Sequence, residues 1–302
     1  MGVVSPISQI LEKPLDKYTI VRLHKTTFPK SQITLGKVIS EDDTFTSRVF
    51  YFTVDGKKVS GLMNVPKTGE PFPVILLLRG FVDQKMYKPG IGSQQIGAQL
   101  AKNGFVTLSP DFFGYGESAS ASADGFEDRF QTYTTALTLF SSVSTLNNAG
   151  VAVDPKKVGI WGHSNGGHIA LATLAISGKA YPTVLWAPVS KPFPYSILYY
   201  TDEFDDSGKA LRKSLADFEN DYDVNKYTFT NHLDWITAPI QLHQGTGDIE
   251  VPYWWSDDLV AKLKDKKKDI EYFTYPGDDH NLSPNGWSTA VQRSISFFRE
   301  HL

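Results

Sequence analysis

Short apolar runs alternate with longer segments of mixed polarity along most of the chain. Residues 74–78 are apolar at every position, which is typical of a strand buried on both faces of a parallel sheet. Ahead of this run, the turn pair Asp55-Gly56 separates two β-rich segments and predicts a hairpin. The pattern predicts strands at 49–54, 59–65, 74–78, 105–108, 157–161, 182–186, 239–243 and 270–275, and helices at 93–103, 126–147, 166–177, 254–265 and 285–301. Such alternation indicates an α/β fold with a mainly parallel, twisted sheet and helices on both faces.

Two segments fall outside this alternation. Residues 1–47 are polar and irregular, and we interpret them as an N-terminal extension. Residues 188–235 are rich in Tyr and Asp and lie between two predicted strands. This second segment is long enough to form a small cap over a site, so we expect one catalytic domain over residues 48–302 with a cap insertion.

Composition narrows the classes of function. With a net charge of -3, the chain lacks the excess of Lys and Arg that a nucleic-acid partner requires. It contains no Cys, which excludes disulfides and Cys-based metal sites within it, and we expect neither a metal nor a cofactor. No run approaches the ~20 apolar residues of a membrane span, and the N-terminus lacks the pattern of a signal peptide. A cytoplasmic location and secretion with a signal removed both stay open, as does the oligomeric state.

The candidate chemistry begins at residues 162–166, which read Gly-His-Ser-Asn-Gly. This G-x-S-x-G motif follows a predicted strand and precedes a predicted helix. A nucleophile elbow has that arrangement, with the serine on a strained strand-to-helix turn. We therefore expect Ser164 to be a nucleophile, with an ordinary glycine-rich turn as the alternative.

A serine nucleophile needs a general base, and in this order of elements the base is a histidine that follows the acid in the chain. His243 lies inside a predicted strand, and His232 lies in the insertion. His280 lies in the loop between the last strand and the last helix, at the edge of the sheet where the nucleophile also lies. We expect His280 to be the base.

The acid is expected in the loop after the strand at 239–243. Asp248 follows two nearby glycines in this loop, which suits a sharply presented side chain. Glu250, Asp278 and Asp279 are the alternatives. Residues beside His280 in its own loop are poorly placed to face its ring, so we expect Asp248.

These motifs resemble those of the α/β hydrolases, in the branch that includes prolyl oligopeptidases and dienelactone hydrolases. The matching pieces lie at residues 111–118, 162–167, 243–248 with Val251-Pro252 after them, and 275–277 before His280. The resemblance covers about residues 48–302 and implies an α/β-hydrolase fold and a serine hydrolase. It also implies an oxyanion hole formed by the backbone N–H groups of Asn165 and of Phe81.

One departure from the family bears on the substrate. Peptidases of the prolyl oligopeptidase type use a tyrosine hydroxyl near the oxyanion loop, where this chain has Leu78 and Arg79. We expect Arg79 either to hold the loop through hydrogen bonds or to bind an acidic substrate group.

Aromatic residues gather where a substrate pocket is expected, with Trp186, Tyr199 and Tyr200 as the candidates for substrate binding. We expect a small-molecule ester as substrate, with a small or aromatic acyl group that is transferred to Ser164 in an acyl-enzyme. An exopeptidase or acylaminoacyl peptidase with the same triad is the alternative, and a non-catalytic binding protein is the third interpretation.

Overall fold

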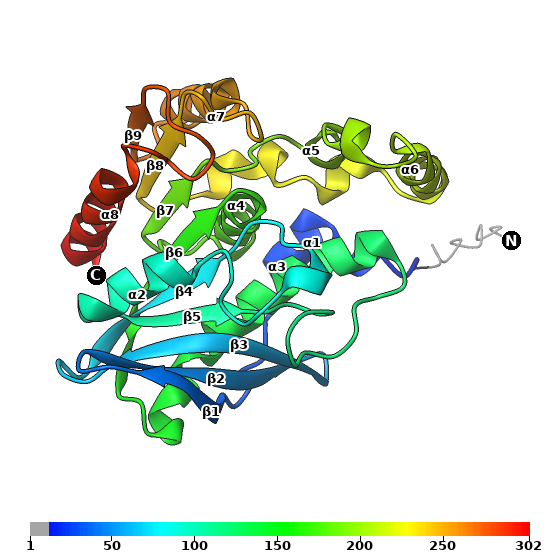
Figure 1. Cartoon of the computed structure of the whole chain (residues 1–302). Helices are drawn as coiled ribbons and strands as arrows, with labels where there is room; N and C mark the ends of the chain where they lie inside the picture. The colour runs from blue at the N-terminus through cyan, green and yellow to red at the C-terminus, as the bar shows by residue number, and fades with distance from the viewer. Residues whose placement is uncertain (1–11) are drawn as a thin grey trace, which may run out of the picture.

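Nine strands form one twisted sheet in the computed structural model, which describes residues 12–302 (Figure 1). In chain order the strands are β1 (Thr34–Glu41), β2 (Phe45–Val54), β3 (Lys57–Pro66), β4 (Phe72–Leu78), β5 (Val106–Pro110), β6 (Val153–His163), β7 (Thr183–Trp186), β8 (Ile240–Gly245) and β9 (Ile270–Tyr275). Their order in the sheet is β1-β2-β3-β5-β4-β6-β7-β8-β9. Pairing is antiparallel from β1 to β5 and parallel from β5 to β9, which confirms the predicted fold class.

Helices cover both faces of the sheet. The α-helices are α1 (Ile20–Lys25), α2 (Gln94–Lys102), α3 (Gly125–Ser142), α4 (Asn165–Ser177), α5 (Tyr195–Leu198), α6 (Lys209–Asp221), α7 (Tyr253–Asp265) and α8 (Trp287–His301). Six short 3-10 helices connect them: η1 (Asp16–Tyr18), η2 (Gln84–Met86), η3 (Val143–Ala149), η4 (Thr201–Glu203), η5 (Val224–Tyr227) and η6 (Phe229–Trp235). Helices α2 and α8 lie on one face, and α1, α3 and α4 on the other (Figure 1).

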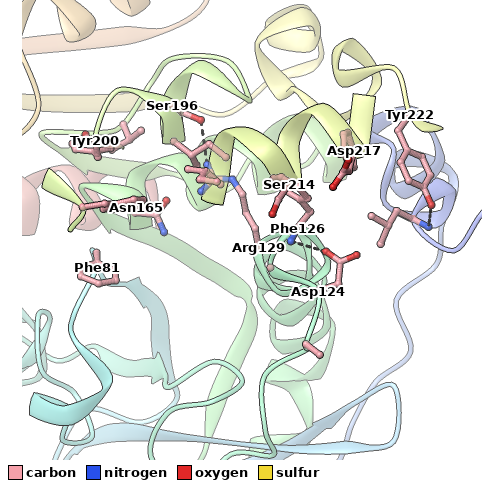
Figure 2. A pocket seen from close by; sticks show the side chains of 18 of the residues that line it. Phe81, Asp124, Phe126, Arg129, Asn165, Ser196, Tyr200, Ser214, Asp217 and Tyr222 are labelled. Atoms are coloured by element: carbon pink, nitrogen blue, oxygen red, sulfur yellow. Dashed lines mark hydrogen bonds between the residues drawn. The ribbon is translucent and has the colours of Figure 1, made fainter. Parts of the chain in front are cut away.

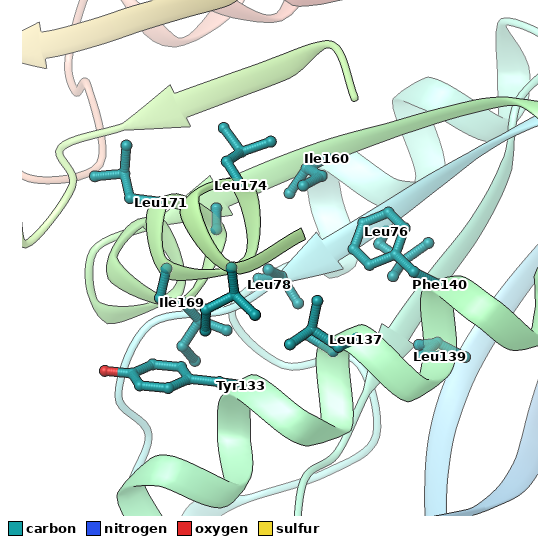
Figure 3. Packing of buried hydrophobic residues seen from close by; sticks show 14 of the residues in the cluster. Leu76, Leu78, Tyr133, Leu137, Leu139, Phe140, Ile160, Ile169, Leu171 and Leu174 are labelled. Atoms are coloured by element: carbon teal, nitrogen blue, oxygen red, sulfur yellow. The ribbon is translucent and has the colours of Figure 1, made fainter. Parts of the chain in front are cut away.

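The two faces of β4 show how the apolar run at its centre produces this layering. Side chains alternate across a strand, so Ile75 and Leu77 enter the core under α2 and α8. Leu76 and Leu78 enter the opposite core, where α3 and α4 pack over them (Figure 3). A strand buried on both faces therefore reads as a continuous apolar run, and β4 carries the loop that follows it to the edge of the candidate site.

The N-terminal segment was predicted to be irregular, but its described part contains the short helices η1 and α1 and the strand β1. Strand β1 pairs with β2 at the edge of the same sheet, and the boundary expected at residue 47 falls inside β2. All but two residues of β1 are exposed, so neither face shows the alternation of a half-buried strand. Part of the predicted extension, residues 1–11, lies outside the described residues.

The predicted cap follows β7 and leads back to β8. Helices α5 and α6 project beyond the sheet, past the end of α4 (Figure 1). Phe218 of α6 anchors the cap because its ring packs against Phe126 and Phe130 of α3 and against Phe193. None of the helices in the described part of the chain is long and apolar enough to cross a membrane.

Candidate active site

Ser164 occupies the sharp turn between β6 and α4. Its backbone has φ 57° and ψ −123°, a left-handed conformation that costs energy for a residue with a side chain. Two backbone hydrogen bonds hold the turn, from Ser164 N to Trp186 O (3.0 Å) and from Val189 N to Ser164 O (3.0 Å). The serine therefore has the strained conformation that the elbow motif predicts.

Close packing around the turn depends on two glycines. A Cβ atom at Gly166 would overlap the carbonyl oxygen of Leu78 at the end of β4. A Cβ atom at Gly80 would lie only 2.9 Å from Cβ of Ser164. The loop after β4 can therefore lie directly against Ser164 only because both positions lack side chains.

The loops after β8 and β9 bring Asp248 and His280 together. The distance from His280 Nδ1 to Asp248 Oδ2 is 2.8 Å, and the Asp248 side chain is fully buried. Nδ1 donates this hydrogen bond, which leaves Nε2 as the acceptor nitrogen of a neutral ring. That is the tautomer a base needs in order to take a proton from serine.

Asp248 is also held by its own loop. Oδ1 accepts hydrogen bonds from the backbone N–H groups of Glu250 (2.9 Å) and Val251 (2.8 Å), and Oδ2 accepts one from Gln244 Nε2 (3.0 Å). Burial raises the pKa of Asp248, but the hydrogen bonds from His280, Val251 and Gln244 outweigh it and lower the pKa below its ordinary value. The group is therefore a carboxylate at neutral pH.

The alternative acids do not bond Nδ1 of His280. Asp278 accepts hydrogen bonds from the backbone of Asn285 and Gly286, and Asp279 accepts them from Asn281 N and Ser283 N. Both residues shape the loop around His280 without bonding its ring. Glu250 Oε2 lies 4.0 Å from His280 Nε2, the nitrogen that Asp248 does not bind, and the Glu250 side chain is exposed.

His163 is a neighbour of the base that the sequence analysis missed. Its ring centroid lies 4.5 Å from that of His280, and its Nε2–H donates to the backbone oxygen of His280 (3.0 Å). Burial, followed by the nearby His280, lowers the pKa of His163 to about 4, so the ring is neutral at pH 7. This contact joins the base loop to the residue directly before Ser164.

The candidate oxyanion donors, Asn165 and Phe81, come from two elements. Asn165 is the first residue of α4, where backbone N–H groups have no partner within the helix. Phe81 lies in the loop after β4, and its side chain lies beside Asn165 (Figure 2). Both residues border the same pocket as Ser164.

Arg79 is buried beneath this loop. Its guanidinium donates to Gly80 O (2.9 Å) and to Asp111 O (3.0 Å), and it stacks over the rings of Tyr87 and Tyr115 at 4.7 and 4.2 Å. Of the two roles expected for Arg79, these contacts favour holding the loop.

Ser164 lines a cavity of about 1440 Å³, which Ser214 and Asp217 of the cap border as well (Figure 2). Tyr200 lines it, as expected. Tyr199 instead packs on Trp255, with ring centroids 4.7 Å apart. Trp186 is buried in the core, where its Nε1 donates to Ser294 Oγ (3.3 Å). The structure thus places one of the three predicted aromatic side chains in the lining of the cavity.

Comparisons with known proteins agree with this geometry. Residues 93–302 match the prolyl oligopeptidase family. The chain belongs to this family. A sequence relative is dipeptidyl peptidase family member 6 of Caenorhabditis elegans, 23% identical over 202 residues, which cover 63% of this chain and 26% of that protein.

Two solved structures share the fold of this prolyl oligopeptidase family member. An acetyl xylan esterase from Paenibacillus sp. R4 aligns with a TM-score of 0.63 at 16% identity, over 92% of this chain and 91% of that one. Est1E from Butyrivibrio proteoclasticus, solved with bound ferulic acid, aligns with a TM-score of 0.56 at 20% identity, over 83% of this chain and 98% of that one. The protein is therefore an α/β hydrolase of the prolyl oligopeptidase branch.

Across residues 12–302, no group of three or more His, Asp or Glu side chains is arranged to hold a metal ion.

Proposed function

We propose that this protein hydrolyses carboxylic esters with small or aromatic acyl groups, through an acyl-enzyme on Ser164. One observation carries the proposal. The buried Asp248 carboxylate accepts the Nδ1–H of His280 at 2.8 Å, so the ring keeps Nε2 available as a base, and the ring lies against His163, the residue before Ser164.

In the proposed reaction, Ser164 Oγ attacks the ester carbonyl carbon and its proton passes to His280 Nε2. The negative charge on the carbonyl oxygen is stabilised by the N–H groups of Asn165 and Phe81. The C–O bond to the alcohol then breaks, and His280 returns the proton to the leaving oxygen. Water, deprotonated by the same nitrogen, attacks the acyl-enzyme, and the protonated His280 restores the Ser164 hydroxyl as the acid leaves.

Esters are favoured over peptides because of the loop after β4. Arg79 lies near the place where related peptidases use a tyrosine hydroxyl, and its guanidinium donates hydrogen bonds to backbone oxygens of the protein. The two tyrosines beside it are also engaged, since Tyr87 OH donates to Asp111 and Tyr115 OH donates to Val82 O. An amide requires more stabilisation of the oxyanion than an activated ester does, and one missing donor costs about 3 kcal/mol.

The acyl selectivity is proposed from the walls of the cavity. Phe81, Phe126, Tyr200 and Phe218 contribute rings to it, and flat side chains favour flat acyl groups by stacking and burial. Among the structures with this fold, one is an acetyl xylan esterase and another holds ferulic acid. These similarities support small and aromatic acyl groups as the first to be tested.

An exopeptidase or acylaminoacyl peptidase is the second candidate, because the sequence relative is a dipeptidyl peptidase family member. A substrate with a free amine would need available carboxylates in the cavity. Asp217 and Asp221 on its wall pair with Lys213 and Lys13, and Asp124 caps the N-terminus of α3. Glu250, also on the wall, lies 4.0 Å from His280 Nε2, at the base and not at a separate amine site. These engagements favour the esterase over an amine-binding peptidase.

The test is a comparison of kcat/KM for p-nitrophenyl esters of graded acyl length and for amino-acid p-nitroanilides. Methyl ferulate extends the ester series to an aromatic acyl group. We expect ester turnover to exceed anilide turnover by orders of magnitude. Anilide turnover that rivals ester turnover would reject the esterase in favour of the peptidase.

A further inference from the structure

Arg129 presents a positive charge to the cavity, and no side chain that the structure describes gives it a negative partner. Its Nη2 lies 3.2 Å from His168 Nε2 and 3.3 Å from Ser196 Oγ, while its Nε is buried and has no hydrogen-bond partner. Figure 2 shows the side chain rising from α3 into the cavity, towards Ser196. Among the described side chains, Arg129 forms no ion pair with a carboxylate, whereas the exposed Arg22 pairs with Glu12 at 2.8 Å.

A neutral histidine orients this guanidinium. His168 Nδ1 lies 3.0 Å from Val189 O and donates to it, so Nε2 is the acceptor nitrogen. Nε2 receives hydrogen bonds from Tyr133 OH (2.9 Å) and from Arg129. Burial, followed by the charge of Arg129, lowers the pKa of His168 well below its ordinary value. The hydrogen bonds of His168 therefore fix the direction of the guanidinium, but this neutral ring supplies no negative charge to it.

The carboxylates on the cavity wall do not balance it either. Asp217 and Asp221 pair with lysines, and the side chain of Asp124 accepts hydrogen bonds from backbone N–H groups of α3. Glu250, also on the wall, lies 4.0 Å from His280 Nε2. A partly buried cation without a counter-charge is costly, and a bound anion is the usual means of stabilising it.

The position of Arg129 relative to Ser164 defines which part of a substrate it would meet. His168 lies four residues after Ser164 on α4, which corresponds to a rise of roughly 6 Å along the helix. Arg129, Phe81 and Asn165 also border a smaller adjoining pocket of about 220 Å³, on the oxyanion side of the nucleophile. The loop with Phe81 follows β4 and the loop with His280 follows β9, on opposite sides of β6 in the sheet.

The leaving alcohol must lie on the His280 side, because it takes its proton from Nε2. The acyl group then extends to the other side, towards Arg129. We propose that Arg129 is a carboxylate-binding residue for the acyl part of the substrate, so that half-esters of short dicarboxylic acids are the preferred substrate class. This inference rests on the proposed ester hydrolysis and specifies its acyl group.

Binding is tested without turnover in the Ser164→Ala protein by isothermal titration calorimetry. Monomethyl glutarate carries one carboxylate, and dimethyl glutarate is its neutral counterpart. We expect the half-ester to bind about 10- to 100-fold more tightly, as charge-assisted hydrogen bonds to a guanidinium would give. Adding Arg129→Met should remove this preference, and adding Arg22→Met, which alters an exposed arginine, should keep it.

Equal affinity for the two ligands, or an unchanged preference in the Arg129→Met protein, would overturn the proposal. Should Arg129→Met fail to fold, Arg129→Lys keeps the charge without the planar fork, and we expect its preference to be reduced. A preference fully retained in the lysine variant would contradict the assignment of carboxylate binding to the guanidinium group. Hydrolysis of p-nitrophenyl butyrate by the wild type tests the esterase separately, because the binding measurement does not depend on it.

The acyl side is tested by kcat/KM for two substrates of the wild-type protein. Monomethyl glutarate carries its carboxylate on the acyl part, and 4-acetoxybutyrate carries it on the alcohol part. We expect the first to be the better substrate. The reverse order would overturn the placement of the anion on the acyl side.

Discussion

At the scale of single residues, the site rests on the orientation of His280. The Asp248 carboxylate fixes its ring through Nδ1, and the His163 ring packs beside it at 4.5 Å between centroids. Asp248 was predictable from sequence because a loop after a strand has a definite place at the sheet edge. His163 was not, since its role arises from a contact with a residue 117 positions away in the chain.

Replacing Asp248 tests this orientation. Asp248→Asn would place a donor where the ring needs an acceptor, which favours the wrong tautomer of His280. We expect kcat to fall by about 10⁴-fold. Asp279→Asn is the control, because Asp279 bonds only its own loop, and we expect it to cost less than about 10-fold. A larger loss of kcat from Asp279→Asn than from Asp248→Asn would place the acid in the loop of His280 and contradict the assignment of Asp248.

Arg79 provides a second test at this scale. Its hydrogen bonds to Gly80 O and Asp111 O hold the loop that carries Phe81 against Ser164. Arg79→Met removes these bonds while keeping much of the side-chain volume, so we expect kcat to fall by about 10- to 100-fold, less than for a deleted oxyanion donor. If KM rises instead and kcat is unchanged, Arg79 binds substrate and does not support the oxyanion loop.

At the scale of elements, periodicity predicted those parts whose burial is regular. The strand β4 and the helix α4 are buried almost throughout, and their apolar runs reflect this. The edge strand β1 is mostly exposed, so its polar sequence carries no signal of a strand. In the cap, Tyr199 and Tyr200 are adjacent residues of the same type, so the sequence does not distinguish them. The packing that follows α5 decides which of them lines the cavity.

The cap therefore offers a matched pair of variants. Tyr200 lines the cavity, and Tyr199 packs on Trp255 outside its lining. We expect Tyr200→Ala to change the ranking of acyl groups, measured as kcat/KM over a series of p-nitrophenyl esters. Tyr199→Ala should leave the ranking nearly unchanged. If neither variant changes it, the cap is only a cover over the site.

At the scale of the whole molecule, two fully buried histidines link stability to pH. Burial lowers the pKa of His243 to about 3 and holds the pKa of His168 well below 6.5. In the unfolded chain both groups titrate near 6.5. At a pH between the folded and unfolded pKa values, the unfolded chain binds more protons than the folded one. The free energy of unfolding is therefore highest above pH 6.5, and it decreases as the pH falls below 6.5.

We expect each of the two histidines to remove about 2 kcal/mol from the free energy of unfolding between pH 7 and pH 5. Urea unfolding at a series of pH values measures this, with His243→Gln as the variant that should lose about 2 kcal/mol less over the same range. His243 bonds Tyr275 OH and Gln241 Oε1, and a glutamine can replace part of this pairing. A stability that is flat from pH 7 to pH 5 would contradict the neutral, buried state of both rings.

The central claim is that Ser164 is the nucleophile of an esterase, and the most direct test is the turnover of p-nitrophenyl butyrate by Ser164→Ala beside the wild type. Ser164 lines the cavity, and its side chain makes no capping hydrogen bond to α4, so we expect the turn to keep its conformation without the hydroxyl. We predict that the variant folds as the wild type does and that its kcat falls by about 10⁴-fold or more. A folded Ser164→Ala protein that keeps more than about a tenth of wild-type turnover would contradict the claim.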